Sequence, residues 1–347
     1  MRCEKPKKAV YQKIKENWDK VAKPLDGLGK FEHITAEIGA ILGKENFSIK
    51  KRAVVAMCAD NGVVEEGISQ SGQEVSTIVT KFMGQMQSSV GKMAQVANCE
   101  VIVTDIGLAG NEIISGVRNR KVRPGTRNFY REPAMTKEEA LCAIEIGIQT
   151  VEKAKEASFT ILGTGEMGIG NTTTSSAMAA AMLRCPVEEV TGRGAGLCDA
   201  ALERKKKIIQ ESIEKYNLLE ESASELDILC CVGGLDIAGL VGVFLGGALY
   251  HVPIVIDGVI SAVAALTADR MMPGCRDYML ASHNGKEPAT GKILELLGKD
   301  AVIYGDLALG EGTGTVMLFA LLDMAMALYE SNTTFDEMRV TQYERYP

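Results

Sequence analysis

Residues 163–176 have the sequence GTGEMGIGNTTTSS and join an apolar run at 159–162 to an alanine-rich segment at 177–183. Four glycines let the backbone approach a ligand closely, and the free N–H groups at a helix start favour a phosphate or carboxylate. The stretch therefore predicts a strand, an anion-binding turn and a helix. Glu166 is unusual there, because it brings a negative charge into the turn.

Apolar, β-branched runs recur along the chain and alternate with segments of helical periodicity. We expect strands at residues 53–58, 101–106, 159–162, 226–232, 252–256 and 301–304. Apolar positions spaced about 3.6 residues apart predict helices at 75–94 and 199–219. Continuous apolar strands that alternate with helices indicate a parallel sheet covered on both faces. The predicted fold is α/β, with a three-layer, Rossmann-like parallel-sheet core at about residues 50–320.

Both ends of the chain have amphipathic, helix-like patterns, at residues 9–20 and 316–330. We expect them to pack together as a small helical subdomain formed from about residues 1–45 and 320–347. No Pro/Ser-rich linker separates these segments from the core. The prediction is therefore one domain over residues 1–347.

Composition limits the classes of partner and the compartment. The net charge of -7 argues against nucleic acid or an anionic membrane as the main partner, so we expect small-molecule substrates. Nine cysteines without a C-x-x-C pair predict reduced, buried thiols, and three histidines without ligand spacing predict no metal site. The charged N-terminus predicts no signal peptide, and the apolar run 237–250 is shorter than the ~20 residues a bilayer requires. We expect a cytoplasmic protein.

Glycine and acidic residues recur where the predicted strands end. They follow in the segments 59–62, 163–166, 233–236, 257–258 and 305–306, with GEGTG at 310–314 shortly after the last. Ligands of parallel sheets bind outside the carboxyl ends of the strands. Ordinary turn and N-cap chemistry explains any one of these segments equally well. Their number favours a shared site.

The G-x-G-x-x-G pattern at 163–168 raises the alternative of a dinucleotide site. Such a site needs a second strand that ends in an acid about 20 residues later, and residues 185–190 lack the apolar run. Glu166 would also face the pyrophosphate. No lysine precedes Thr172, so a Walker loop is disfavoured as well. The anion site is therefore expected at residues 168–173, and an oxidoreductase remains only a third hypothesis.

Three further charged or basic residues have two interpretations each. Glu311, between two glycines and near apolar residues, is either a general base or a carboxylate at a helix N-terminus, and the residues alone leave both open. Lys205 lies in a basic run that usually marks a solvated helix face, but it follows a glycine-rich turn and can fold back onto a phosphate. His283 can act as a base, although we expect a structural histidine.

Several motifs in this order resemble the nicotinate-nucleotide:dimethylbenzimidazole phosphoribosyltransferase family, over nearly the whole chain. The most specific are E-x-G-I-G-N-T-T at 166–173 and G-E-G-T-G at 310–314. Others are LDGLGKFE at 25–32, GRG at 192–194 and GGLDIA at 233–238. The resemblance implies a parallel-sheet core with a helical subdomain from both termini, a homodimer, and no cofactor.

The resemblance also implies a reaction and a set of roles. The 5-phosphoribosyl group passes from nicotinate mononucleotide to a ring nitrogen of the base, with inversion at C1′. The family's catalytic base matches Glu311. The positions that match its phosphate and ribose contacts are Glu166, Gly168, Gly170, Asn171, Thr172, Thr173, Gly194, Lys205, Asp257 and Gly258. Those that match its base pocket are Ser69, Gln73, Met167 and Leu309.

The sequence departs from the family pattern at three places. Asn61 stands where the family usually has histidine, Ser71-Gly72 replaces an aromatic-proline pair, and Gly285 replaces a serine. Because the first two changes lie in or next to the base-binding segment, the base can be a benzimidazole, a purine or a phenol. A non-catalytic nucleotide-binding subunit of a hetero-oligomer is the second class of function, which the intact Glu311 disfavours.

Overall fold

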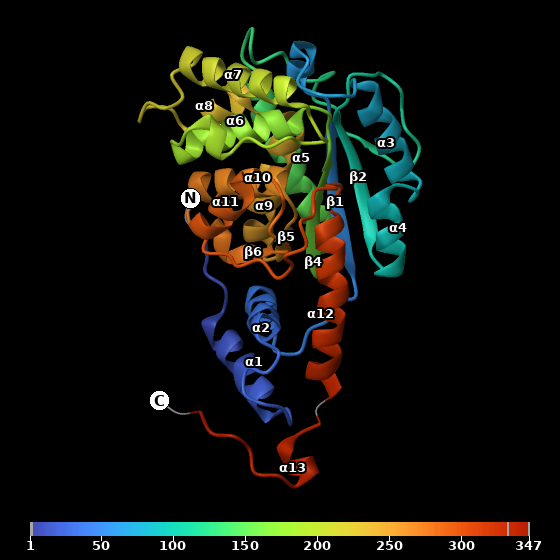
Figure 1. The fold of residues 1–347 in the computed structure, drawn as a ribbon. Coiled ribbons are helices and arrows are strands. Elements are labelled where there is room, and N and C mark those ends of the chain that lie inside the picture. The colour runs from blue at the N-terminus through green and yellow to red at the C-terminus, as the bar shows by residue number, and fades with distance from the viewer. Residues whose placement is uncertain (1–2, 332, 346–347) are drawn as a thin grey trace.

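Six strands form one sheet at the centre of the protein, with every neighbouring pair parallel (Figure 1). The computed structural model describes residues 3–331 and 333–345. The order across the sheet is β3-β2-β1-β4-β5-β6, so the direction of strand addition reverses between β1 and β4. The strands are β1 (Arg52–Ala59), β2 (Glu100–Gly107), β3 (Arg118–Asn119), β4 (Ile161–Met167), β5 (Ile254–Ile256) and β6 (Met279–Ala281).

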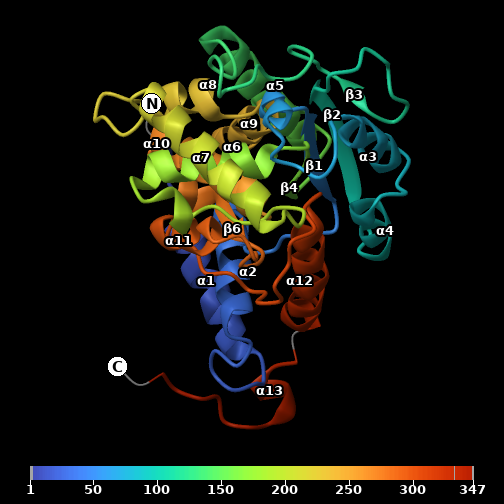
Figure 2. The same cartoon turned by 45° about the horizontal axis from the view of Figure 1, so that its top comes forward.

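Helices cover both faces of this sheet, which confirms the predicted three-layer α/β fold. They are α1 (Lys8–Lys20), α2 (Lys30–Leu42), α3 (Glu74–Gly84), α4 (Ser89–Val96), α5 (Lys137–Glu156), α6 (Asn171–Leu183), α7 (Asp199–Lys215), α8 (Glu225–Val232), α9 (Leu235–Tyr250), α10 (Val259–Met271), α11 (Ala289–Leu296), α12 (Thr313–Ser331) and α13 (Phe335–Met338). Figure 2 shows β1 and β4 between α6 and α7 on one side and α3 and α4 on the other.

Strand β1 explains why the sequence pattern is continuous rather than alternating. All eight of its residues are buried. Val55 and Met57 point into the core that α5, α9 and α10 cover, whereas Val54 and Ala56 point into the core that α2, α4 and α12 cover. Successive side chains of a strand face opposite sides, so a strand buried on both faces needs apolar residues at every position.

The terminal helices pack beside one end of the sheet. In Figure 1, α1, α2, the lower part of α12 and α13 lie together below the strands. Trp18 of α1 is fully buried, and its Nε1 donates to Thr35 Oγ1 of α2 at 2.8 Å. Arg345 pairs with Asp19 and Asp26, which ties the C-terminal segment to the N-terminal one. The division into one domain with a helical subdomain stays a prediction.

Two predicted strands are wrong. Residues 226–232 form helix α8, because Ser224 and Asp227 make a reciprocal capping box that starts a helix. A short apolar run does not by itself distinguish a strand from a buried helix. Residues 301–304 contribute only a single bridge, between Ile303 and His283. The strands β3 and β6 were not predicted, since they have two and three residues.

The predicted boundaries also change at two places. The helix expected at 75–94 is two helices, α3 and α4, because Met86 has a left-handed backbone and the Ser88 side chain caps α4. The strand expected at 159–162 begins at Ile161 and continues to Met167. Gly163 to Glu166 therefore lie in β4 itself, and the turn that joins it to α6 is only residues 168–170.

The expectation that the cysteines are buried needs revision, and one helix is unusually apolar. All nine cysteines are free thiols, but only Cys58, Cys99 and Cys275 are buried; Cys142 and Cys198 are exposed, and the other four are partly buried. One helix in the described part of the chain, α12, has a window, Thr313–Glu330, long and apolar enough to cross a membrane. Within the protein 56% of that window is buried, and α12 packs against β4, α2 and α4. A core helix passes the same test of length and composition.

Candidate active site

The candidate site lies where the loops after β4 and β5 meet the segment that precedes α12. This is the carboxyl edge of the sheet, next to the point where strand order reverses between β1 and β4. A cavity of about 180 Å³ opens there. Ten of the predicted site residues line it: Glu166, Met167, Gly168, Asn171, Thr172, Gly194, Asp257, Gly258, Leu309 and Glu311.

Glu311 is held in an unusual backbone conformation. Its φ is 60°, and its neighbours Gly310 and Gly312 have φ of 82° and 96°. A non-glycine residue in the left-handed region is strained, and such residues gather at functional sites. The Glu311 Oε2 accepts a hydrogen bond from the backbone N–H of Val90 at 2.9 Å, at the start of α4. The positive end of that helix favours a negatively charged group beside it.

Glu166 lies at the end of β4, beside Glu311. Its Oε1 accepts a hydrogen bond from the Glu311 backbone N–H at 3.4 Å, and its Oε2 accepts one from the Asn171 side-chain amide. Desolvation raises the pKa of Glu166, the charge of Glu311 raises it further, and the two hydrogen bonds oppose both effects. Two carboxylates therefore share one wall of the cavity.

Asp257 and His283 form a second polar group in the cavity wall. Asp257 Oδ1 accepts the Thr315 N–H at 3.1 Å, and burial, assisted by the charge of Glu166, raises the pKa of Asp257 to about 7. His283 Nδ1 is 2.9 Å from Ser282 Oγ and 4.0 Å from Asp257 Oδ1. Burial lowers the pKa of His283 to about 4, so its ring is neutral at pH 7. It is hydrogen-bonded as expected of a structural histidine, and it also lines the cavity.

The predicted anion site begins with a tight turn. Gly170 has φ of 93°, and α6 starts at Asn171, as the sequence predicts. Three N–H groups of this segment are already used by the protein, among them that of Asn171, which donates to Gly168 O at 3.1 Å. The Ile169 N–H donates to Ser76 Oγ at 3.0 Å, and the Thr173 N–H donates to Gly170 O at 2.9 Å. An anion therefore has fewer backbone donors available here than the sequence suggests.

Lys205 lies directly behind this turn and does not belong to a solvated helix face. Its side chain is fully buried, and Nζ donates to Thr172 Oγ1 and to Gly192 O, both at 3.1 Å. Burial lowers its pKa to about 8, while the Glu287 charge acts in the opposite direction. Glu287 lines the cavity and accepts the Gly194 N–H at 2.9 Å. The Lys205 ammonium group thus lies next to Thr172, in the segment where an anion is predicted to bind.

Four predicted residues lie beside or behind the main cavity. Ser69 and Gly170 line an adjoining cavity of about 80 Å³, which shares Gly168, Asn171 and Thr172 with the first. Gln73 Nε2 donates to the Asn61 carbonyl oxygen at 3.1 Å. Thr173 is fully buried. Within residues 3–331 and 333–345, no group of three or more His, Cys, Asp or Glu side chains could hold a metal ion.

The sequence hints at one further site residue, Glu287, but not at the contact between Val90 and Glu311. Glu287 follows His283 closely in the chain, so an acid near the predicted site was visible. The Val90 N–H had no signal, because it belongs to a segment predicted as the middle of a helix and lies 221 positions from Glu311.

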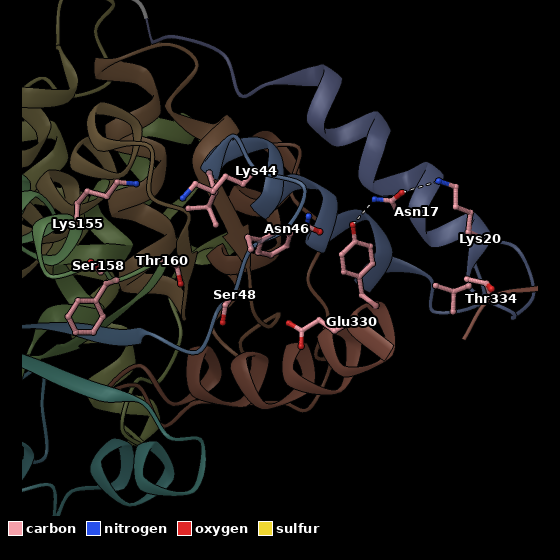
Figure 3. A pocket seen from close by; sticks show the side chains of 15 residues that line it. Asn17, Lys20, Lys44, Asn46, Ser48, Lys155, Ser158, Thr160, Glu330 and Thr334 are labelled. Carbon is pink, nitrogen blue, oxygen red and sulfur yellow. Dashed lines mark hydrogen bonds between the residues drawn. The ribbon is translucent and has the colours of Figure 1, made fainter. Parts of the chain in front are cut away.

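A larger cavity, of about 890 Å³, lies at the opposite edge of the sheet (Figure 3). Lys44 and Lys155 point toward one another across it, and Lys20 lies at its far side. Four helices, α1, α2, α5 and α12, end at this cavity. Helix C-termini carry partial negative charge, which the three lysines offset. The helix ends thus explain the lysines without a ligand. The cavity is also remote from the carboxyl ends of the strands, where the candidate site lies.

Comparisons with known proteins agree on one family. A family model described as Phosphoribosyltransferase matches residues 3–340. A nicotinate-nucleotide–dimethylbenzimidazole phosphoribosyltransferase of Clostridium perfringens is 42% identical over 325 residues, which is 94% of this chain and 90% of the relative. The enzyme of the same name from Ruminiclostridium cellulolyticum is 41% identical over 333 residues, or 96% and 94% of the two chains.

Two solved structures from Thermus thermophilus have the same fold. One is a structure of CobT, with a TM-score of 0.90 over 96% of this chain and 100% of that one. The other is a nicotinate-nucleotide–dimethylbenzimidazole phosphoribosyltransferase, with a TM-score of 0.89 over 97% and 100%. Both are 35% identical in sequence to this chain.

Proposed function

The chain belongs to the nicotinate-nucleotide–dimethylbenzimidazole phosphoribosyltransferase family, and on that premise we propose its reaction and its catalytic residues. The enzyme transfers the 5-phosphoribosyl group of nicotinate mononucleotide to a ring nitrogen of 5,6-dimethylbenzimidazole or a similar base. The products are an α-ribazole phosphate and nicotinate. Glu311 is the general base, and C1′ is inverted. The observation that carries these roles is the hydrogen-bonded pair of Glu166 and Glu311 in the cavity wall.

The chemistry needs a base more than it needs an acid. Nicotinate leaves through a pyridinium nitrogen, so its departure neutralises a cation and requires little protonation. The attacking ring nitrogen has a lone pair and no hydrogen. As it bonds to C1′ the imidazole ring becomes positively charged, and the N–H on the other ring nitrogen becomes acidic. A positioned carboxylate that takes this proton accelerates the reaction by about 10²–10⁴. Glu311 is suited to this step because the Val90 N–H holds its carboxyl group in place and its backbone is fixed between two glycines.

Glu166 has a different part in the proposal. A carboxylate beside the sugar can accept hydrogen bonds from the ribose hydroxyls and stabilise positive charge that develops at C1′. The phosphate would lie at the other end, toward Thr172, Gly194 and Lys205, whose buried ammonium supplies a counter-charge. The placement of Glu166 and Glu311 at one end of the cavity and of Lys205 behind the other supports this orientation of the nucleotide, although Glu287 also lies at the Lys205 end.

The base would lie against Met167 and Leu309, with Ser69 and Gln73 at the neighbouring segment. Gln73 is held by the backbone carbonyl of Asn61, the residue that departs from the family pattern. A purine or a phenol therefore remains an alternative acceptor. The noncatalytic-subunit alternative has no observation in its favour here.

One experiment tests the reaction and the acceptor together. The purified protein is incubated with nicotinate mononucleotide and, separately, 5,6-dimethylbenzimidazole, benzimidazole, adenine and cresol, and nicotinate release is followed by chromatography. We expect release with at least the benzimidazoles. Release with cresol or adenine alone would reassign the acceptor. No release with any base would contradict the proposed function and leave the noncatalytic subunit.

We further propose that the protein is a homodimer in the cytoplasm. Helices α3 and α12 each expose large apolar side chains, Ile78 and Phe82 on the first and Met317 and Met324 on the second. Such exposure on a water-soluble surface supports association with another chain. Analytical ultracentrifugation of the purified protein would show a single species of twice the chain mass.

A further inference from the structure

Asp236 is a fully buried carboxylate next to the site, and the proposed reaction gives it no role. It is the second residue of α9 and has no exposed surface. Its Oδ1 accepts the Ile237 N–H at 3.0 Å, and its Oδ2 accepts the Asn171 side-chain amide, also at 3.0 Å. A buried charge without a cationic partner is costly, so its place here needs an explanation.

The Asn171 amide joins Asp236 to Glu166. Its Nδ2 donates to Asp236 Oδ2 and also to Glu166 Oε2. Both hydrogens of one amide group are therefore used by two carboxyl groups. Whatever fixes Asp236 consequently fixes the direction of Asn171, and Asn171 in turn orients the Glu166 carboxylate toward the cavity.

Asn61 is a neighbour of Asp236 whose side-chain oxygen lacks a hydrogen-bond donor in the described part of the chain. Its Nδ2 donates to Ile169 O at 3.4 Å, so its Oδ1 points the other way and is buried without a hydrogen-bond partner in the described part of the chain. A Cβ added at Gly234 would meet both Asn61 Oδ1 and Asp236 Oδ1, so the two oxygens approach the same small space beside this glycine. A buried carbonyl oxygen needs a donor, and a carboxyl group supplies one only when it is protonated.

The surrounding charges act in the same direction. Burial and, to a smaller extent, the Glu166 charge raise the pKa of Asp236, the Asn171 hydrogen bond opposes them, and the resulting pKa is about 7. The titratable groups that interact with Asp236 in the described chain are Glu166 on β4 and the Cys58 thiol on β1. Burial raises the pKa of Cys58, so the thiol stays neutral. Glu166 has two N–H donors and no unpartnered acceptor beside it, which favours the charge on Glu166.

We infer that Asp236 is a positioning residue that carries a proton in the active enzyme, donates it to Asn61 Oδ1 and holds the Asn171 amide, so that Glu166 is the charged member of the pair. This inference rests on the proposed function of Glu166. Asp236 itself does not touch the substrate. Its loss should therefore affect turnover, through the orientation and charge of Glu166, more than it affects nucleotide binding.

Two substitutions separate positioning from simple structural support. Asp236→Asn keeps the shape, stays neutral, and offers an amide to Asn61 and an oxygen to Asn171, and it loses only the acceptor for the Ile237 N–H. Asp236→Ala removes both contacts. We expect Asp236→Ala to lower kcat by about 10- to 100-fold, as is typical when the support of a functional side chain is removed, with a smaller change in KM for the nucleotide. Asp236→Asn should retain kcat close to wild type, and the capping variant Asp227→Asn on α8 serves as the matched control.

The pH profile gives the sharper readout. In the wild type, kcat should fall as pH rises through about 7, because a second negative charge then forms beside Glu166 and repels Asn61 Oδ1. In Asp236→Asn that fall should be smaller, and what remains is assigned to Asp257, whose pKa is also raised to about 7. Equal losses in Asp236→Asn and Asp236→Ala, or the same pH profile in wild type and Asp236→Asn, would overturn the inference.

A spectroscopic measurement tests the proton without turnover. The infrared carbonyl band of a protonated carboxyl group should be present below pH 7 in the wild type and reduced in Asp236→Asn. An identical band in both proteins would contradict protonation of Asp236. If the band behaves as expected but no base gives nicotinate release, the proposed function fails while the protonation of Asp236 stands.

Discussion

The Glu166 carboxylate accepts a hydrogen bond from the backbone N–H of Glu311 at 3.4 Å, although 145 positions separate the two residues. Gly310 makes this approach possible, because a Cβ at that position would lie 2.6 Å from Glu166 Oε1. The contact joins the end of β4 to the segment before α12. The glycines around Glu311 thus serve both its backbone conformation and its distance from Glu166.

Replacing Glu311 with glutamine tests its role as the general base. The glutamine side chain can still accept the Val90 N–H, so the site should keep its shape, but it cannot take a proton. We expect Glu311→Gln to lower kcat by about 10²–10⁴ with little change in KM for nicotinate mononucleotide. Nicotinate release measures both. Glu330→Gln, at the opposite end of α12, is the control. Near-normal turnover of Glu311→Gln would mean that Glu311 is only a carboxylate at a helix N-terminus and not the general base.

The Gly310→Ala substitution tests the spacing of the two carboxylates. It should destabilise the protein by about 1–2 kcal/mol, because alanine disfavours a left-handed backbone, and it should also displace Glu166 and lower kcat. Gly298→Ala is a matched control, with φ of 64° and open space around the added Cβ. Thermal unfolding should show similar losses in both variants, whereas only Gly310→Ala should lose activity. Equal activity in the two variants would argue against the spacing.

The lowered pKa of Lys205 should make the stability of the protein depend on pH. Its native pKa is lowered to about 8 from 10.5, so the native state releases its proton before the unfolded state does. The free energy of unfolding should therefore rise between those pH values through this residue. In Lys205→Met this contribution should vanish, which denaturant titrations at several pH values would show. A wild-type rise that persists unchanged in Lys205→Met would mean that other groups cause it.

The same substitution tests the proposed phosphate contact. Hydrogen bonds to charged groups contribute about 1.5–3 kcal/mol, so Lys205→Met should raise KM for nicotinate mononucleotide by about tenfold or more. In the wild type, KM should rise above pH 8 as the ammonium loses its proton. An unchanged KM in Lys205→Met would place the phosphate elsewhere.

Leu309 tests the location of the base. Its side chain is 54% exposed on the cavity wall, so a bound aromatic ring would cover it. Leu309→Ala removes apolar contact and should raise KM for the base by roughly three- to tenfold, leaving KM for the nucleotide unchanged. Leu296→Ala on α11 is a control of similar exposure, 48%. An effect on the nucleotide instead would reverse the proposed orientation of the two substrates.

The layered fold was predictable because its main strands are buried on both faces. In β1 and β2 such burial leaves a continuous apolar run in the sequence, and the helices α1, α7 and α12 show clear periodicity. The helix α8 was missed because residues 226–232 are apolar at most positions and carry no period. The Ser224–Asp227 capping box is the local sequence feature that indicates a helix here instead of a strand. The break between α3 and α4 depends on Ser88, whose hydrogen bond the pattern does not reveal.

The candidate site was predictable in part. Glycines and acids at the strand ends pointed to Glu166, Asp257 and Glu311, and the structure brings all three to one cavity. Their roles, and those of Ser69, Gln73 and Thr173 outside its lining, stay predictions. Burial of Lys205 was the less expected of its two alternatives, because a run of basic residues usually faces water, and here only one of them turns inward.

The sequence by itself determined the alternation of buried strands and helices, the start of α6 at Asn171, and the need for glycine on both sides of Glu311. These features depend on a few neighbouring residues, through side-chain period, capping and backbone sterics. Only the tertiary structure decided that Val90 donates to Glu311, and that one amide of Asn171 serves both Glu166 and Asp236. Such contacts join segments far apart in the chain, so packing of the whole sheet and its helices decides which groups meet and which carboxyl group holds a proton.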